Sequence, residues 1–184
     1  RLSGFTINAN NLAHAILLVN NSAFTNVTVP NQVRIDHNII ESGTSMQPIV
    51  VKAMWGVIDN NTFNHSRSLT IVGTNSSAEW DSDMCPIVYG LSRYMHIEDN
   101  TFNMDNNMCA ISHSYGGRSV MRYNQFNTAS VNPNTIVDMH NMDPLYYGTM
   151  GTEMYGNKVT ATTSATVLYY GQRGGKGLFF NNYI

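Results

Sequence analysis

Residues 95–102 read MHIEDNTF, and residues 57–63 have already read VIDNNTF. Both stretches follow the pattern apolar-x-x-Asn-x-apolar. The pattern occurs at seven places, with its Asn at Asn10, Asn38, Asn61, Asn100, Asn124, Asn157 and Asn182. A local pattern that returns about every 24 residues, with insertions, is typical of a solenoid, so the repeat predicts stacked, equivalent units.

A second series of short β-prone runs follows the first, beginning at Ile49, Ile87, Ile111, Ile136 and Val167. The longest interval between two pattern Asn residues predicts one insertion, at about 65–83. Strands that keep a constant register predict parallel sheets in which equivalent residues stack. The Asn side chains would then form a hydrogen-bonded ladder, and Phe63, Phe102 and Phe126 an internal aromatic stack.

The phrases GFTINANN, VIDNNTF and HIEDNTF resemble the right-handed parallel β-helix proteins. This pectate-lyase-like group includes polygalacturonases, alginate epimerases and phage tailspikes. The resemblance covers the whole chain and implies an all-β, right-handed parallel β-helix of about seven rungs with loop insertions. Residues 1–184 then form a single segment without a cap at either end, and we expect it to be part of a longer chain. Because this architecture hosts lyases, hydrolases, epimerases, adhesins and stalks, activity must be argued from a site.

Composition excludes several classes of partner. The net charge is −2, only 12% of residues are charged, and the basic residues are scattered, so no electrostatic footprint for nucleic acid exists. No apolar run reaches membrane-spanning length. Asn-x-Ser/Thr triplets fit an extracellular, cell-surface or virion protein, although an Asn-rich chain also produces them by chance; they begin at Asn20, Asn26, Asn60, Asn64 and Asn75.

One column of the pattern strand is predicted to be acidic and to face outward. On successive rungs it contains Asp36, Asp59 and Glu98, and Arg122 follows. Stacked carboxylates repel one another, so the column predicts a bound cation such as calcium, a neighbouring arginine or a catalytic use. In pectate lyases, acidic residues on adjacent rungs hold calcium and an arginine abstracts the proton, and these four residues resemble that set in type. The alternative is a solvated surface row neutralised by Arg122.

Aromatic and charged residues also accompany the second series of strands. Such side chains along a solenoid suit sugar rings, through stacking and bidentate hydrogen bonds. The candidate polysaccharide-binding residues are Tyr89, Arg93, His113, Arg118, Asp138 and Tyr169. Within this set, His113 and Asp138 are a candidate acid–base pair, and satisfied structural residues are the alternative.

Two further features concern assembly. If the second strand series faces inward at its isoleucines, an outward apolar stripe follows, formed by Leu17, Val50, Val88, Val137 and Leu168. Such a stripe usually marks a contact surface, and tailspike-like proteins associate as trimers, so we expect a homo-oligomer. Cys85 and Cys109 lie at the same place on adjacent rungs, either as a disulfide or as two buried thiols.

The sequence therefore predicts an extracellular or virion-surface segment that binds polysaccharide along its long face. Cleavage by lyase or hydrolase chemistry stays open. Polygalacturonases carry paired aspartates where this chain has Asn106 and Asn107, which puts hydrolysis in doubt. The alternative is a purely structural stalk or adhesin segment that assembles with copies of itself or with other domains of the same chain. No cofactor is expected apart from calcium.

Overall fold

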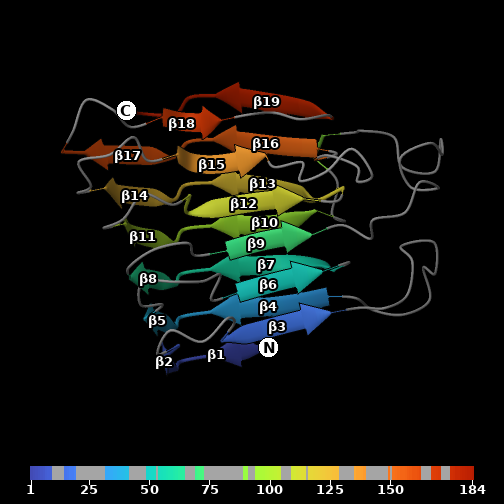
Figure 1. Cartoon of the computed structure of the whole chain (residues 1–184), viewed down its shortest axis with the longest axis vertical. Helices are drawn as coiled ribbons and strands as arrows, with labels where there is room; N and C mark the ends of the chain where they lie inside the picture. Colours follow the sequence, from blue (N-terminus) through green and yellow to red (C-terminus); the bar gives the residue numbers. More distant parts are fainter. Residues whose placement is uncertain are drawn as a thin grey trace.

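The computed structural model describes residues 1–9, 15–19, 32–41, 49–52, 54–64, 69–72, 89–90, 94–104, 109–114, 116–128, 135–139, 149, 151–162, 167–170 and 175–184. Within these ranges the chain forms strands and turns, and no helix long and apolar enough to cross a membrane is present. The strands build three sheets in which every pairing is parallel (Figure 1).

Sheet A contains seven strands: β1 (Leu2–Ser3), β4 (Gln32–Asp36), β7 (Trp55–Asp59), β10 (Met95–Glu98), β13 (Arg118–Arg122), β16 (Gly151–Tyr155) and β19 (Lys176–Phe180). Sheet B contains six: β2 (Thr6–Asn8), β5 (Ile39–Glu41), β8 (Thr62–Asn64), β11 (Thr101–Met104), β14 (Gln125–Thr128) and β17 (Lys158–Ala161). Sheet C also contains six: β3 (Ile16–Val19), β6 (Ile49–Lys52), β9 (Leu69–Val72), β12 (Ile111–Ser114), β15 (Thr135–Met139) and β18 (Val167–Tyr170).

Successive strands visit sheets A, B and C in turn, and the chain then returns to sheet A one step further along the stack. The two termini consequently lie at opposite ends of the stack, from the blue N-terminal strands to the red C-terminal strands of Figure 1. This order is consistent with a parallel β-solenoid. The all-β prediction and the parallel arrangement are thereby confirmed.

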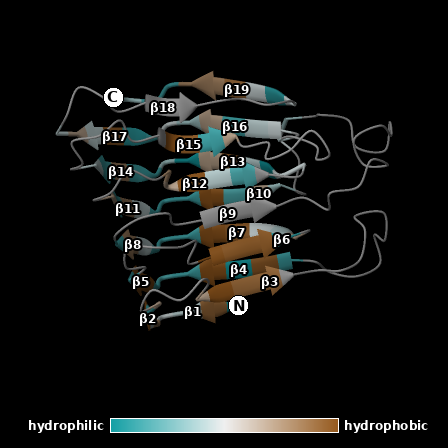
Figure 2. Ribbon diagram, in the orientation of Figure 1, coloured by the Kyte–Doolittle hydropathy of each residue, from teal (hydrophilic) through white to brown (hydrophobic). Residues whose placement is uncertain are grey.

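The core lies between the three sheets and consists of stacked columns of apolar side chains. Phe63, Phe102 and Phe126 are at most 1% exposed, and their ring centroids lie 4.7 and 4.9 Å apart in consecutive stacked pairs. Hydrophobic residues are most concentrated on β3, β4, β6 and β7, near the N-terminal end (Figure 2). Since no rung can bury such residues alone, the stacking itself creates the core.

The register corrects the first predicted unit. Leu2 pairs with Ile35, and Ile7 pairs with Ile40, so the position equivalent to Asn38 is occupied by Phe5. The backbone N–H of Phe5 donates to Oδ1 of Asn38, 3.0 Å away. Asn10, which the spacing placed at this position, lies outside the described residues.

The register of sheet C corrects the second strand series. Leu69 of β9 pairs with both Ile49 and Ile111, so the predicted insertion at 65–83 in fact contains a strand, and Ile87 lies outside the described residues. The run LTIV is as β-prone as the run chosen from the sequence, and spacing alone does not order a strand and an insertion. Ile111 pairs with Val137, which in turn pairs with Tyr169, so the predicted column of Ile136 and Val167 is also wrong.

The described residues do not form the predicted outward apolar stripe. Val137 is fully buried, and the column that contains Leu17 and Val50 continues through Thr70, Ser112, Asp138 and Tyr170. Leu17 is exposed, whereas Val50 is buried. The side chains of Val88 and Leu168 lie outside the described set. The error follows from the register, because a shift of one residue moves a side chain to the other face of its strand.

Each of the six connections from sheet A to sheet B is a turn of two residues, and the same turn follows β19. The second residue is a ladder position, and the first has a positive φ, between 52° and 79°; the first residues are Gly4, His37, Asn60, Asp99, Tyr123, Gly156 and Asn181. Asn, Asp and Gly tolerate this left-handed conformation best, which explains five of the seven residues. His37 and Tyr123 are the two exceptions. In the sequence, the Gly, Asn or Asp that precedes most ladder Asn residues is the signal for this turn.

The ladder residues Asn38, Asn61, Asn100, Asn124 and Asn157 are at most 2% exposed, and each hydrogen-bonds the ladder Asn of the next rung. In every step the backbone N–H and Nδ2 both donate to Oδ1 of the next Asn, the last acceptor being Asn182. Nδ2 also contacts backbone carbonyls of its own rung and of the preceding one, as Asn100 does with Glu98 and Ile58. The ladder thus satisfies backbone groups that the tight turn would otherwise leave buried without partners.

Replacing a central ladder residue should therefore be costly. Asn100→Ala removes an amide at 1% exposure and leaves the N–H of Asn61 and the carbonyl of Ile58 without their present side-chain partner. We expect the free energy of unfolding to fall by about 3 kcal/mol or more, since several buried polar groups lose partners together. Urea unfolding measures it. The control Asn103→Ala, at a half-buried outward position, should cost about 1 kcal/mol; equal losses would contradict a special role for the ladder.

A second prediction concerns Gly56, which lies in β7 at φ 145°. A Cβ at this position would lie 1.9 Å from the backbone oxygen of Val33 on the neighbouring strand, so Gly56→Ala cannot be accommodated without moving the backbone. We expect a loss of about 4 kcal/mol or failure to fold. Gly4→Ala is the control, because its φ is 79° with no atom within 4 Å of the added Cβ; it should cost about 1 kcal/mol. Thermal and urea unfolding of both variants would show this difference, and similar stabilities would refute it.

Candidate functional site

The predicted acidic column exists as a column in sheet A. Asp36 pairs with Asp59, Asp59 with Glu98, and Glu98 with Arg122. Tyr155 and Phe180 continue the column toward the C-terminal end. The parallel register holds these side chains one strand apart along the outer face of the sheet.

Each carboxylate of the column is paired with an arginine. Arg1 contacts Asp36 through two hydrogen bonds of 2.5 and 2.9 Å, and Arg34 contacts Asp59 through two of 2.8 and 3.1 Å. Nε of Arg122 lies 2.5 Å from Oε2 of Glu98. Asp36 and Asp59 are only 0% and 5% exposed, so both carboxylates are covered rather than open to solvent. The three arginines therefore offset the repulsion between the stacked carboxylates.

The pairing fixes the protonation states of two predicted catalytic residues. The hydrogen bond from Arg1 holds the pKa of Asp36 well below its usual range, against the effect of burial. The hydrogen bonds of Arg122 with Glu98 and then with Tyr155 raise the pKa of Arg122. Asp36 therefore stays an ionised carboxylate, which has no proton to donate. Arg122 stays a protonated guanidinium, which is not suited to abstract a proton.

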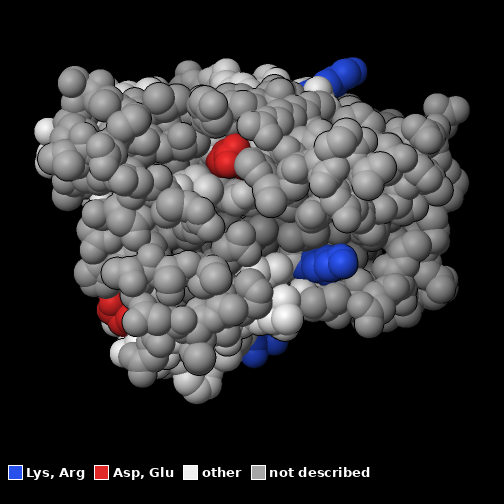
Figure 3. All heavy atoms as spheres, viewed as in Figure 1, with Lys and Arg blue, Asp and Glu red and all other residues white. Residues whose placement is uncertain are grey.

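The pairing of carboxylates with arginines also affects whether the column could bind a calcium ion. Among the residues that the structure describes, no group of three or more His, Cys, Asp or Glu side chains is arranged to hold a metal ion. Arg1 and Arg34 take up oxygen lone pairs that a calcium ion would need. On the face shown in Figure 3, the described Lys, Arg, Asp and Glu residues are separated from one another and form no large patch of one sign.

An aromatic platform lies at the C-terminal end of the column, and we define it as Tyr155 and Phe180 of the column together with Tyr123 of the adjacent turn. Tyr155 and Phe180 are stacked with centroids 4.7 Å apart, and Tyr123 meets Tyr155 edge-on at 6.0 Å. Tyr123 is 56% exposed and Phe180 43% exposed. Arg122 donates to the hydroxyl of Tyr155 over 3.1 Å, and its guanidinium carbon lies 5.9 Å from the ring centroid of Tyr123. The sequence pattern predicted the column as far as Arg122 and did not predict the platform.

The predicted polysaccharide-binding residues that the structure describes lie on different parts of the fold. Tyr89 lies in a turn whose next residue, Gly90, donates its backbone N–H to Glu153 over 2.5 Å. Arg118 begins β13 on sheet A, whereas Asp138 and Tyr169 lie on β15 and β18 of sheet C. Arg93 lies outside the described residues, as does Cys85 of the predicted cysteine pair.

His113 lies inside the molecule and is 0% exposed, so it is not positioned to contact a glycan. It pairs with Met139, whereas Asp138 pairs with Ser112, so His113 and Asp138 face opposite sides and form no acid–base pair. Nε2 of His113 lies 2.8 Å from Oγ of Ser119, and burial lowers the pKa of His113 to about 3. One rung further on, Thr152 donates to Sδ of Met139 over 3.2 Å, so a hydroxyl-to-acceptor contact recurs here.

No family model, curated protein or solved structure matches this chain.

The burial of His113 predicts a pH-dependent stability. The folded pKa, about 3, lies below the unfolded value near 6.5, so between these values protonation favours the unfolded chain. The stability contributed by neutral His113 is complete above pH 6.5 and is lost as the pH falls. We expect the free energy of unfolding to drop by roughly 2 to 3 kcal/mol between pH 7 and 4.5.

Urea unfolding at both pH values measures this drop. The matched variant is His113→Met, because Met139 already occupies the equivalent position on the next rung. The variant should lose most of the pH dependence in this range. The same drop in both proteins would show that other groups cause it.

Proposed function

We propose that the chain is a right-handed parallel β-helix segment of about seven rungs, from an extracellular or virion-surface protein, that binds polysaccharide along the outer face of sheet A. The seven parallel strands of sheet A support the rung number. The general right-handedness of crossovers between parallel strands supports the hand. The observation that carries the binding function is the exposed aromatic platform beside Arg122.

The platform suits sugar rings for a physical reason. A sugar presents C–H groups on its ring faces and hydroxyls at its edge, so it stacks on an aromatic ring while its edge hydrogen-bonds to polar neighbours. The guanidinium of Arg122 is already oriented by Glu98 and Tyr155 and is 33% exposed, so its remaining N–H donors can reach a hydroxyl or a carboxylate. Because these groups are held in place before binding, little conformational entropy is lost when a ligand arrives.

Binding is better supported than cleavage. With Asp36 ionised and Arg122 protonated, these two residues can orient a ligand electrostatically. Neither is in the protonation state that its catalytic role would require. A lyase would need a base that abstracts a proton, and Arg122 is tied to Glu98 in its charged form.

The alternative is a structural stalk or adhesin segment that assembles into an oligomer. The observation that favours it is the matching of all three column carboxylates by arginines, because such pairing is also what a purely stacking column requires. A trimer in light scattering together with no glycan binding would select this alternative.

Two substitutions in the platform test the proposal. Tyr123→Asn removes one ring and introduces the residue found at two equivalent turn positions, Asn60 and Asn181; Phe180→Ala removes another. Each should weaken binding to a polysaccharide that the wild type binds by about tenfold, the value of one aromatic contact. Affinity electrophoresis on a panel that includes polygalacturonate and neutral glucans, followed by calorimetry, measures the change.

The control is Tyr183→Ala, because Tyr183 is 68% exposed and lies outside the platform. It should leave binding unchanged. Equal binding by the wild type and both platform variants would overturn the proposal.

A further inference from the structure

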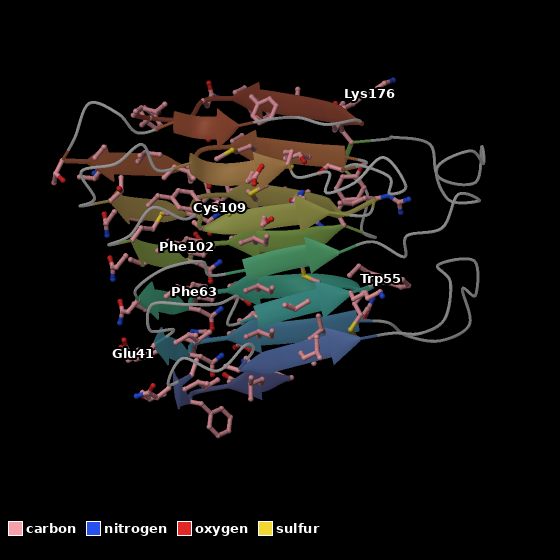
Figure 4. The ribbon with its side chains drawn as sticks, in the orientation of Figure 1. Glu41, Trp55, Phe63, Phe102, Cys109 and Lys176 are labelled. Carbon is pink, nitrogen blue, oxygen red and sulfur yellow. The ribbon has the colours of Figure 1, made fainter. Side chains whose placement is uncertain are left out.

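The outer face of sheet B carries a second row of hydrogen-bonded amides, separate from the buried ladder and from the platform. We call it the outer amide row and define it as Asn64, Asn103 and Asn127, on β8, β11 and β14. The register places Glu41 at its N-terminal end and Thr160 at its C-terminal end. Figure 4 shows Glu41 at the outer edge of β5, away from the interior.

Neighbouring amides in the row are linked in one direction. Nδ2 of Asn64 donates to Glu41 over 2.7 Å, and Asn103 and Asn127 each donate to the preceding Asn over 2.8 Å. Gln125 adds a side-chain bond of 2.8 Å to Asn127 and one of 3.0 Å to Thr160. The amide planes are therefore held in fixed orientations without any ligand.

Asn103 and Asn127 have amide donors and acceptors that the bonds along the row do not use. A carboxamide has two N–H donors and two acceptor lone pairs, and the bonds along the row use one of each at Asn103 and at Asn127. Both residues are half-buried, so their outward edges reach solvent. Each of these two amides therefore presents a donor and an acceptor side by side, the arrangement that matches a pair of neighbouring hydroxyls.

A parallel row lies two residues earlier on each strand. Thr62 pairs with Thr101, which pairs with Gln125, so two hydroxyls and an amide lie beside the outer amide row. All three are half-buried. The outward residues of β8, β11 and β14 are thus uncharged over three successive rungs, whereas the acidic column of sheet A is made of ion pairs.

We propose that this face binds a neutral, extended, β-linked glycan that lies along the stack, with successive sugars contacting successive rungs. The ligand is a glycan because paired donors and acceptors complement vicinal hydroxyls, and because parallel strands repeat at about 4.8 Å, similar to the rise of one sugar in an extended chain. It is neutral because the outward residues of β8, β11 and β14 are uncharged, and the charged residues on the two flanking strands, Glu41 and Lys158, are of opposite sign. The inference rests on the proposed function only in taking a glycan as the ligand class, and the residues involved are different.

The geometry disfavours a peptide in this place. The backbone N–H and C=O groups of sheet B are used in parallel pairing between its strands, so a partner strand cannot add to the face. The available contacts are side-chain amides and hydroxyls, repeated at the strand spacing, which favours a polymer with the same repeat.

The test uses cellohexaose as the neutral probe and hexagalacturonate as the acidic one, with calorimetry as the readout. The main variant is Thr62→Val/Thr101→Val, which removes two hydroxyls while keeping β-branched side chains of nearly the same shape. A second variant, Asn103→Ala, interrupts the outer amide row. Both should bind cellohexaose at least tenfold more weakly, and urea unfolding should show that the double valine variant is as stable as the wild type.

Leu17→Ala, at an exposed position of β3 in sheet C outside both proposed surfaces, serves as the control and should leave cellohexaose binding unchanged. If cellohexaose binding falls in Tyr123→Asn and not in the sheet B variants, the inference is overturned while the proposed function stands. Binding of hexagalacturonate without any binding of cellohexaose would also overturn the inference and leave the proposed function standing. Failure of the wild type to bind any glycan would overturn both.

Discussion

The hydrogen bond from one ladder Asn to Oδ1 of the next is the interaction on which the rest of the structure depends. It ties a two-residue turn, whose first residue is left-handed, to the same turn on the adjacent rung. Because the turn is so short, fixing it also fixes the register of sheets A and B on either side. Stacking of Phe63, Phe102 and Phe126 follows from that register, and so does the alignment of both outer faces.

A fixed register has a chemical consequence, because it stacks whatever residues occupy equivalent positions. Columns of apolar or amide side chains are stabilised by this stacking, since identical neutral groups pack or hydrogen-bond well. Stacked carboxylates repel one another, and here three arginines from different parts of the chain form ion pairs with them. The electrostatics of sheet A are thus a result of the stacking, and two residues of the aromatic platform, Tyr155 and Phe180, continue the same column after its charged residues end.

The sequence predicted well what depends on local chemistry. The turn needs Asn at one position, and the pattern around it placed the A and B strands from Asn38 onward. Sheet C was harder, because β9 has no turn signature and two equally β-prone runs competed for its place. Burial was hardest: whether His113 faces a glycan or the core depends on a register shift of a single residue, and whether Asp36 is open or covered depends on Arg1, a residue 35 positions away in the sequence.

The two rows of amides also differ in direction. In the buried ladder, each Nδ2 donates toward the C-terminal end of the stack, whereas in the outer amide row each donates toward the N-terminal end. Aligned amides polarise one another, so each row gains cooperative strength as it lengthens, but each also accumulates a dipole along the stack, as a helix does. With the rows opposed, the two dipoles partly cancel over the three rungs that carry both rows, which lowers the opposite partial charges at the two ends of that part of the stack.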